Sequence, residues 1–557
     1  MKRFAPMSRR TLLLGAGAAA TVGAAGAYGQ GHAMRRIAPN RASETFNPDV
    51  DLDLICKRDE ARILNGGPTR VWRYAGNLIK GPSNALTPAP DTYLGPLLRF
   101  SKGQKVRIRL RNELPEETIT HWHGLHVPML MDGHPAAAIH PGETYVYEFE
   151  IRNRAGMYFY HPHTHEKTAT QVYHGLVGGI IIEDDEERAL GLPSGEFEIP
   201  LVIQDRSFDD DNQLVYGGDM HTSMFGFYGD RVLVNGRRDF TVDVANRPYR
   251  LRILNGSNAR IYKLCWDDRT PLTVIGVDGG LLEKAETRPY VMLAPAERVD
   301  LLVDFSGRPQ GAKLTMMSGE FYGLMIPPMA QRMMRGDLAV GEEFPLFTAR
   351  VTQASSDLWK LPEKLSTIRR IRREEVANLD DPIPIAITMA HMAMFLNGRP
   401  YDHDDIQQKE RIPVDTTQLI EIFHEHGGMG MGMGGMGMGR MEMMRGGGMM
   451  RGRMGGMRGG MGMSGMGMMG MMSMAHPIHL HGQQFQIIER SFEGDEDAYA
   501  AIRDGFIDTG LKDTVLVAPG ERVRIVKPFS DFKGRFMYHC HNLEHEDAGM
   551  MREFSVE

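Results

Sequence analysis

A turn followed by an alternating strand occurs three times in the chain, and this repeat restricts the possible folds more than any other feature. The three copies cover residues 140–149, 294–303 and 518–526. In each copy Pro fixes the turn, and charged and apolar residues then alternate, which is typical of a sheet with one buried face. A second marker, Asn-Gly after an apolar residue at 234–236 and 396–398, opens the second and third units. The sequence therefore predicts three β-sandwich domains of about 150 residues each.

The organisation that we expect is all-β, because little of the chain has a helical period and 557 residues are too many for one core. We predict a leader over 1–30, domain one over 31–190, domain two over 191–352, and domain three with its linker over 353–557. The stretch 353–380 has mixed charge and no strand pattern, so we interpret it as the linker.

The first thirty residues resemble an export signal. Arg9 and Arg10 are followed by apolar residues, and residues 25–27 (Ala-Gly-Ala) fit a small-residue cleavage site. The alternative, an uncleaved anchor, is disfavoured because a stretch so rich in Ala and Gly spans a bilayer poorly. We therefore predict export by the twin-arginine route to the periplasm, without stable membrane insertion.

Composition excludes two classes of protein. With 64 Lys plus Arg against 71 Asp plus Glu, the chain has no electrostatic reason to bind nucleic acid. Its 3 Cys exclude a disulfide-framed scaffold. Cys56 and Cys265 either form a disulfide that bridges two domains or, in the interpretation we prefer, are buried free thiols.

Histidines occur as four His-x-His pairs, two in domain one and two at matching places in domain three. The pairs are His121 and His123, His161 and His163, His479 and His481, and His539 and His541. On a strand this spacing puts both imidazoles on one face, about 6–7 Å apart. Eight imidazoles from two domains are enough to hold three metal ions between them, and imidazole suits copper. Five other histidines have no counterpart in the other domain and are not expected to be ligands: His126, His134, His140, His165 and His174.

Cys540 lies between His539 and His541, so its side chain points to the opposite face of the strand. There it can bind a separate copper together with His476, His545 and a weak axial Met550, which is the ligand set of a blue-copper centre. The peptide bonds on either side of Cys540 then connect that centre directly to the cluster of three metals.

These motifs resemble the multicopper oxidase family, and within it the laccase-like copper-efflux oxidases of bacteria. The resemblance covers essentially the whole mature chain. It implies cupredoxin-like Greek-key domains and four copper ions, one of type 1, one of type 2 and two of type 3. The implied type 1 ligands are His476, Cys540, His545 and Met550; the type 2 ligands are His121 and His479; the type 3 ligands are His123, His161, His163, His481, His539 and His541.

Reduction of O₂ to water needs four protons, and the resemblance implies two carboxylates that supply them. Asp132 and Glu546 stand at the positions where the family has such groups. Burial beside the metal cluster can tune the pKa of a carboxyl group towards the working pH. The alternative is a solvated loop aspartate and a surface glutamate.

Residues 427–474 contain 20 of the 41 methionines. Their thioethers favour Cu(I), so we interpret this mobile, glycine-rich insert as a collector that delivers Cu(I) to the type 1 site. The alternative is a low-complexity insertion without a role. The insert comes later in domain three than it does in the copper-efflux oxidases, and Met472 replaces their substrate-site aspartate. Met472 and Met474 are thus candidate ligands for substrate copper, and His424 and His426 are weaker ones.

The function that we predict is a periplasmic oxidase that takes electrons from Cu(I), and less well from phenols, and confers copper tolerance. The alternatives are a general laccase for organic donors and a copper-sequestering protein without catalytic activity. No sequence feature specifies the oligomeric state, and a monomer is the default expectation.

Overall fold

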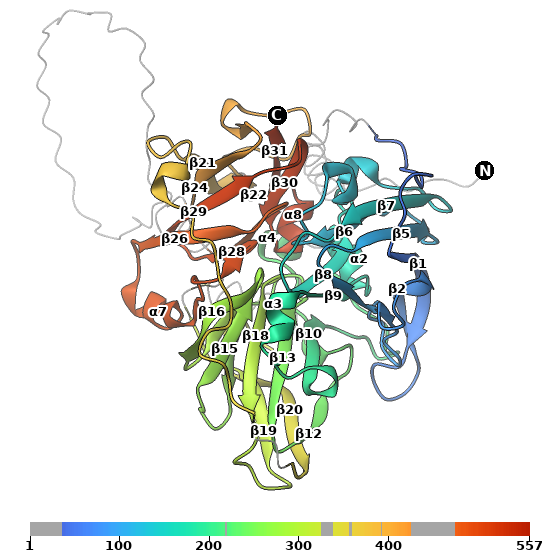
Figure 1. Ribbon diagram of the computed structural model, residues 1–557, viewed down its shortest axis with the longest axis vertical. Coiled ribbons are helices and arrows are strands. Elements are labelled where there is room, and N and C mark those ends of the chain that lie inside the picture. Colours follow the sequence, from blue (N-terminus) through green and yellow to red (C-terminus); the bar gives the residue numbers. More distant parts are fainter. Residues whose placement is uncertain are drawn as a thin grey trace, which may run out of the picture.

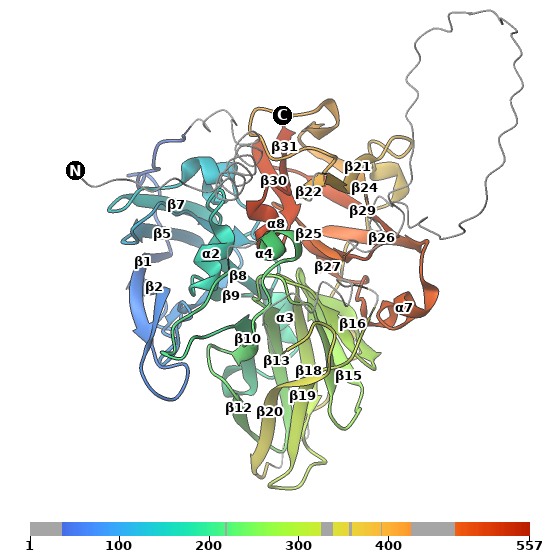
Figure 2. The same ribbon diagram turned by 180° about the vertical axis from the view of Figure 1, so that it is seen from behind.

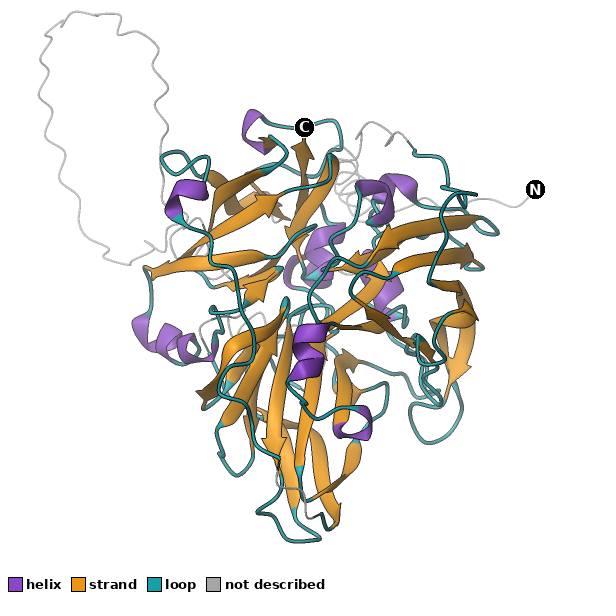
Figure 3. Cartoon of the chain, viewed as in Figure 1, coloured by secondary structure: helices purple, strands orange, loops and turns teal. Residues whose placement is uncertain are grey.

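The computed structural model describes residues 36–217, 220–322, 324, 338–355, 359–390, 393–424 and 474–557. Strands in six sheets are the main regular structure of these residues, with short helices between them (Figure 3). The predicted leader and residues 427–473 of the methionine-rich insert lie outside the described residues. No helix within the described ranges is long and apolar enough to cross a membrane.

The N-terminal third forms the first pair of sheets. One sheet has the order β2-β1-β5-β7 and the other has the order β3-β4-β9-β8-β6. The strands are β1 (Val50–Ala61), β2 (Thr69–Lys80), β3 (Leu86–Thr87), β4 (Leu97–Ser101), β5 (Lys105–Asn112), β6 (Thr120–His123), β7 (Thr144–Glu150), β8 (Gly156–Pro162) and β9 (Gly178–Glu183); the helices are η1 (Met129–Met131), η2 (Pro135–Ala137), α2 (Thr168–Tyr173) and α3 (Asp185–Ala189).

The second pair of sheets has the orders β11-β10-β13-β18-β15-β16 and β12-β20-β19-β14-β17. Its strands are β10 (Glu198–Arg206), β11 (Arg231–Val234), β12 (Thr241–Ala245), β13 (Pro248–Asn255), β14 (Tyr262–Trp266), β15 (Leu272–Val277), β16 (Gly280–Arg288), β17 (Val291–Leu293), β18 (Arg298–Asp304), β19 (Lys313–Ser318) and β20 (Phe344–Gln353); its helices are η3 (Gly195–Phe197) and α4 (Met220–Phe225).

The third pair has the orders β22-β21-β24-β29-β26-β27 and β23-β31-β30-β25-β28. Its strands are β21 (Ile383–Ala390), β22 (Ala393–Leu396), β23 (Arg411–Ile412), β24 (Thr416–His424), β25 (His476–Leu480), β26 (Phe485–Phe492), β27 (Leu511–Lys512), β28 (Thr514–Val517), β29 (Glu521–Phe529), β30 (Gly534–Cys540) and β31 (Met551–Val556); its helices are η4 (Arg373–Glu375), η5 (Gln408–Glu410), α7 (Glu496–Ala500), η7 (Arg503–Gly505) and α8 (Leu543–Asp547).

The same pattern of strand pairing recurs in all three pairs of sheets. Strand β1 runs parallel to β5, β10 to β13, and β21 to β24. The second strand of each couple then pairs antiparallel with β7, β18 or β29, which are the strands of the three sequence repeats. The prediction of an all-β fold with three cupredoxin-like sandwiches is confirmed. The domain boundaries near 190 and 352 stay predictions.

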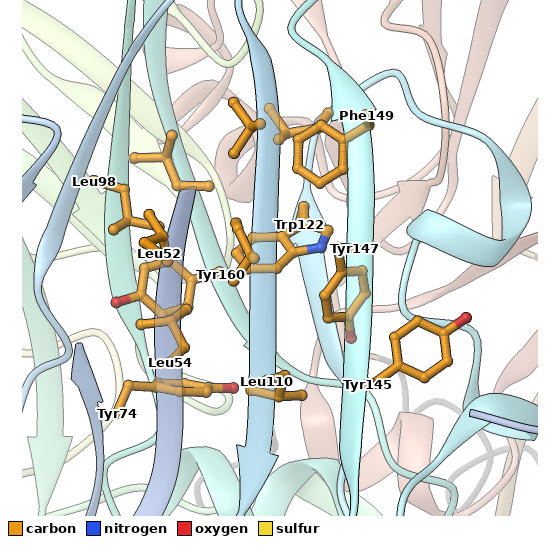
Figure 4. Packing of buried hydrophobic residues seen from close by; sticks show 14 of the residues in the cluster. Leu52, Leu54, Tyr74, Leu98, Leu110, Trp122, Tyr145, Tyr147, Phe149 and Tyr160 are labelled. Atoms are coloured by element: carbon orange, nitrogen blue, oxygen red, sulfur yellow. The ribbon is translucent and has the colours of Figure 1, made fainter. Parts of the chain in front are cut away.

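The core of the first sandwich fixes strand β6, which carries two of the predicted ligands. Trp122 is fully buried and packs edge-on against Tyr147, with ring centroids 5.0 Å apart (Figure 4). Tyr160 of β8 packs on the other side of the indole at 5.7 Å. Because a strand alternates its side chains, burying Trp122 in the core turns its two histidine neighbours to the opposite face.

The three sandwiches meet around a central group of short helices. Helices α2, α4 and α8, one from each third of the chain, lie together between the sheets (Figures 1 and 2). Asp547 of α8 accepts hydrogen bonds from the first two amides of α2, and the nearby Asn542 donates to Phe225 of α4. The functional residues described below surround this junction.

Candidate metal centre

The four His-x-His pairs lie on, or directly after, four strands that pair in the same way in two domains. Strand β6 pairs antiparallel with β8 and places His121 opposite His161. Strand β25 pairs antiparallel with β30 and places His479 opposite His539. The internal repeat therefore produces two equivalent pairs of ligand-bearing strands.

All eight histidines of these pairs are at most 4 % exposed and face one another across the boundary between domains one and three. His163 Nε2 and His481 Nε2 lie 3.3 and 3.2 Å from His539 Nε2. The rings of His123 and His479 stack with centroids 3.7 Å apart. Nitrogens from three different strands thus converge within a few ångströms, as a metal cluster requires.

The hydrogen bonding of these imidazoles fits a metal cluster and is otherwise costly. Within the described residues, several buried ring nitrogens have no hydrogen-bond partner: His121 Nε2, His479 Nε2, and both ring nitrogens of His541. Buried polar atoms are normally paired, because leaving one unsatisfied costs about 1–3 kcal/mol. A cation shared by the lone pairs removes this cost, and imidazole nitrogen is a ligand that copper prefers.

Main-chain oxygens fix the orientation of two of these rings. His121 donates from Nδ1 to the carbonyl oxygen of Asp132 at 2.6 Å, and His479 donates from Nδ1 to the carbonyl oxygen of Asp513 at 2.8 Å. The proton on Nδ1 leaves the lone pair on Nε2, which points into the cluster. Such bonds to the outer nitrogen are how proteins orient histidine ligands.

Cys540 forms a separate cluster on the other face of β30. Its Sγ lies 3.4 Å from His476 Nδ1 and 3.8 Å from His545 Nδ1, and the two imidazole nitrogens are 3.3 Å apart. Met550 is fully buried beside them, and its carbonyl oxygen accepts from the Cys540 amide. A thiolate, two imidazoles and a nearby thioether are the donors of a blue-copper centre.

Comparisons with known proteins agree with this geometry. Family models described as multicopper oxidase match residues 75–187 and 464–557. The sequence is 29 % identical over 503 residues to multicopper oxidase mco of Staphylococcus aureus, covering 90 % of this chain and 88 % of that one. It is 28 % identical over 535 residues to a laccase of Bacillus subtilis (strain 168), covering 88 % and 90 %. The crystal structure of the McoA multicopper oxidase from Aquifex aeolicus matches with a TM-score of 0.70 at 31 % identity, covering 94 % and 99 %. The chain belongs to the multicopper oxidase family.

As a multicopper oxidase, the protein is a copper-dependent oxidoreductase that uses dioxygen and a reducing substrate. The predicted family and the predicted metal are therefore confirmed. The number of copper ions and the assignment of each ligand to one of them stay predictions.

The two predicted acidic residues both lie at the histidine cluster. Asp132 Oδ2 accepts from His481 Nδ1 at 2.7 Å, and Glu546 Oε2 lies 3.1 Å from His539 Nδ1. Burial raises the pKa of Asp132 above its ordinary value. Burial acts in the same direction on Glu546, but the neighbouring His539 and His163 outweigh it and lower the pKa of Glu546 to about 2.

Three contacts at the metal centre of this multicopper oxidase were not predicted. Asp513 contacts His123, Arg298 pairs with Asp513, and the carbonyl oxygen of Met224 accepts from His545 Nε2 at 2.9 Å. Arg298 and Met224 belong to domain two, which has no His-x-His pair. Asp513 directly precedes β28, whose first residue Thr514 lies opposite His479 in the sheet.

The remaining predicted residues fall partly outside the described chain. Met472 and His426 lie outside it, whereas Met474 is buried and its carbonyl oxygen accepts from His424 Nε2 at 3.0 Å. Cys56 and Cys265 are buried free thiols, which is the alternative that we preferred to a disulfide from the sequence. The five unmatched histidines make other contacts: His126 with Asp531, His134 with Glu553, His140 with Arg36, His165 with Glu166 and His174 with Trp72.

Proposed function

We propose that this multicopper oxidase oxidises Cu(I), and less readily phenols, with dioxygen as the acceptor. Four Cu(I) ions each lose one electron, and O₂ with four protons becomes two molecules of water. The observation that supports Cu(I) as donor is the concentration of thioethers and imidazole beside the Cys540 centre.

The ligand assignment in this proposal follows the two clusters. His476, Cys540, His545 and Met550 hold the type 1 copper, and the eight paired histidines hold one type 2 and two type 3 ions. Copper bound here would supply one-electron redox chemistry at the Cys540 site and the reduction of dioxygen at the histidine cluster. The absence of hydrogen-bond partners for His121 Nε2 and His479 Nε2 within the described residues supports the histidine cluster of this set.

The roles of the chain's own residues follow from their contacts. His539 and His541 are covalently joined to Cys540, so the backbone itself links the two clusters. Asp132 holds His481 through its carboxylate, and Glu546 lies beside His539 and His163. Both carboxylates therefore lie where dioxygen would be reduced. The raised pKa of Asp132 suits it to hold a proton, whereas the lowered pKa of Glu546 makes it an ionised acceptor beside His539.

Soft ligands gather at the electron-entry side. Met474 and Met224 belong to one buried cluster, although they come from different domains. The His424 ring lies 5.5 Å from the ring of His476, centroid to centroid. Thioether and imidazole groups bind Cu(I), so this arrangement supports Met474 as a ligand for substrate copper. Met472 lies outside the described residues and is proposed with it only from its position in the sequence.

The alternative is a general laccase, which the name of the Bacillus subtilis relative favours. A copper-sequestering protein without catalytic activity accounts less well for a second, fully buried cluster of eight histidines. Export by the twin-arginine route and a role in periplasmic copper tolerance rest on Arg9 and Arg10 of the leader.

The deciding experiment replaces residues 427–473 with a short Gly/Ser linker and keeps Met474. Loss of the soft ligands should lower kcat/KM for Cu(I), while kcat/KM for a bulky phenol should be unchanged or higher because access improves. Opposite effects on the two substrates exclude misfolding, which depresses both. An unchanged kcat/KM for Cu(I) at limiting copper contradicts the proposal and favours an organic donor.

A further inference from the structure

Asp132 and Asp513 occupy equivalent positions in the two domains that form the histidine cluster. Each aspartate accepts, through its main-chain oxygen, from the first histidine of its own domain's His-x-His pair, His121 or His479. Each carboxylate then reaches across to the second histidine of the other domain's pair. Asp132 Oδ2 contacts His481 at 2.7 Å, and Asp513 Oδ1 contacts His123 at 3.1 Å.

The two carboxylate–histidine contacts differ in one respect, which is the ring nitrogen of the histidine that lies at the carboxylate. Asp132 accepts from Nδ1 of His481, whereas Asp513 accepts from Nε2 of His123. A neutral imidazole carries one proton, so the nitrogen that donates to the carboxylate leaves the lone pair on the other one. His123 therefore presents Nδ1 to the cluster, and that nitrogen lies 3.4 Å from His161 Nε2.

The two carboxylates also differ in what holds them, because Asp513 alone is clamped by an arginine. Arg298 donates from Nη1 and Nη2 to the two oxygens of Asp513 at 2.7 and 2.6 Å. Its other three donors bind the main-chain oxygens of Met157, Ala296 and Asp278. All five N–H groups are thus used, so the guanidinium has one possible position, and a bidentate pair of this kind is rigid.

The surroundings of this ion pair are closed and contain charges of both signs. Both side chains are at most 1 % exposed. Lys512 pairs with Asp278 and Glu297 on the domain-two side, which compensates the neighbouring carboxylates. Gly124, directly after His123, has a φ of +84°, and a Cβ there would lie 2.5 Å from Asp513 Oδ2. The backbone at His123 is therefore shaped to admit this carboxylate.

We propose that Arg298 and Asp513 are positioning residues that fix His123 in the tautomer and orientation with Nδ1 towards a type 3 copper. Domain two, although it carries no His-x-His pair, then controls the geometry of the cluster through Arg298. This inference rests on the proposed assignment of His123 as a copper ligand.

The test compares Arg298→Lys, Asp513→Asn and His123→Gln in the full-length, copper-loaded enzyme. Lysine keeps the charge but cannot form the two parallel hydrogen bonds, and asparagine turns an amide N–H towards the guanidinium. Arg252→Lys is the matched control, because Arg252 is an equally buried arginine of domain two that pairs with Glu198, Glu187 and Asp300, away from the histidines. The readouts are copper retained per chain against a competing chelator, blue absorption per chain, and thermal stability of the copper-free chain.

Arg298→Lys and Asp513→Asn should lower the affinity of the type 3 copper by about 10-fold or more, as loss of a partner behind a metal ligand commonly does. Blue absorption should stay near the wild-type value. Arg252→Lys should lower thermal stability to a similar degree without releasing copper.

Two outcomes overturn the inference, and they are distinguishable. Retention of type 3 copper in Arg298→Lys and Asp513→Asn, while His123→Gln loses it, removes the positioning role and leaves the ligand assignment intact. Retention of all copper in His123→Gln removes the ligand assignment itself, and the positioning role falls with it. Copper loss in Arg252→Lys equal to that in Arg298→Lys also contradicts the proposal, because general destabilisation then explains both.

Discussion

Cys540 supplies a soft sulfur donor to a cluster whose other close members are two imidazoles. Its two neighbours in the sequence, His539 and His541, belong to the histidine cluster. Cys540→Ser replaces a thiolate that copper prefers with a hydroxyl that binds it weakly. We expect loss of the intense blue absorption and of O₂ consumption, in a chain that still folds. Cys265→Ser is the matched control, because Cys265 is also a buried free thiol, and it should keep the colour. Blue absorption in Cys540→Ser contradicts the ligand set.

A substitution at Asp132 tests the supply of protons to dioxygen separately from the supply of electrons. Asp132→Asn can still accept from His481 but carries no exchangeable carboxyl proton. The anaerobic reduction of the blue centre should be unchanged, while the reaction of the reduced enzyme with O₂ slows by about 100-fold. Stopped-flow absorbance of each half-reaction measures the two rates in one sample. Equal slowing of both half-reactions is incompatible with a role as proton donor.

At the scale of elements, helix α8 carries His545 and Glu546 and is held by both neighbouring domains. Glu544 accepts from Tyr216, Asn258 and the amide of Phe227 in domain two. Asp547 accepts from the first two amides of α2 in domain one, which favour a carboxylate at that helix terminus. The position of His545, a proposed copper ligand, therefore depends on contacts between three domains.

Tyr216→Phe tests this dependence by removing one hydrogen bond to Glu544. We expect a loss of stability of about 1 kcal/mol, since one partner of a buried carboxyl group disappears. The blue copper should also be released more readily to a chelator. Tyr173→Phe is the control, because its ring packs 4.7 Å from that of Tyr216 while its hydroxyl binds the carbonyl oxygens of Ser207 and Val215. Identical copper release from both variants contradicts the role of Glu544.

The strands and their contacts also show which features of the fold and of the site could be predicted from the sequence alone. The repeated turns predicted β7, β18 and β29, and the spacing of His-x-His predicted which side chains share a face. Both depend on local alternation along a strand, which one sequence displays directly. The contacts of Arg298 with Asp513 and of Met224 with His545 join residues more than 200 positions apart, so they depend on domain packing that no local pattern encodes.

At the scale of the whole molecule, the buried carboxylate of Glu553 joins domains one and three. Glu553 accepts from His134, His403 and Tyr401 at 2.7–3.0 Å, and Arg535 lies 3.3 Å from its other oxygen. The hydrogen bond to Glu553 raises the pKa of His403 above its ordinary value. Burial alone would raise the pKa of Glu553, but hydrogen bonds from His134 and His403 outweigh it and hold that pKa well below its usual range.

This contact should stabilise the enzyme over a defined range of pH. His403 contributes fully below its unfolded pKa of about 6.5, and the contribution is lost as pH rises through its raised folded value. Glu553 contributes above about pH 4.3 and loses its effect as pH falls. The melting temperature of His403→Gln should therefore fall furthest below wild type near pH 5–6, and the difference should shrink towards pH 9. A difference that is constant with pH contradicts an ionised His403.

The division of the eight histidines between β6, β8, β25 and β30 has a consequence for how the enzyme is made. Four of them come from residues 121–163 and four from residues 479–541. During synthesis more than 300 further residues must be added after the first four histidines before the first histidine of the second group is present. A chain cut short before β25 contains every histidine of the first half-site and can complete none of the cluster. A cluster of all eight histidines therefore requires a chain that extends at least to His541.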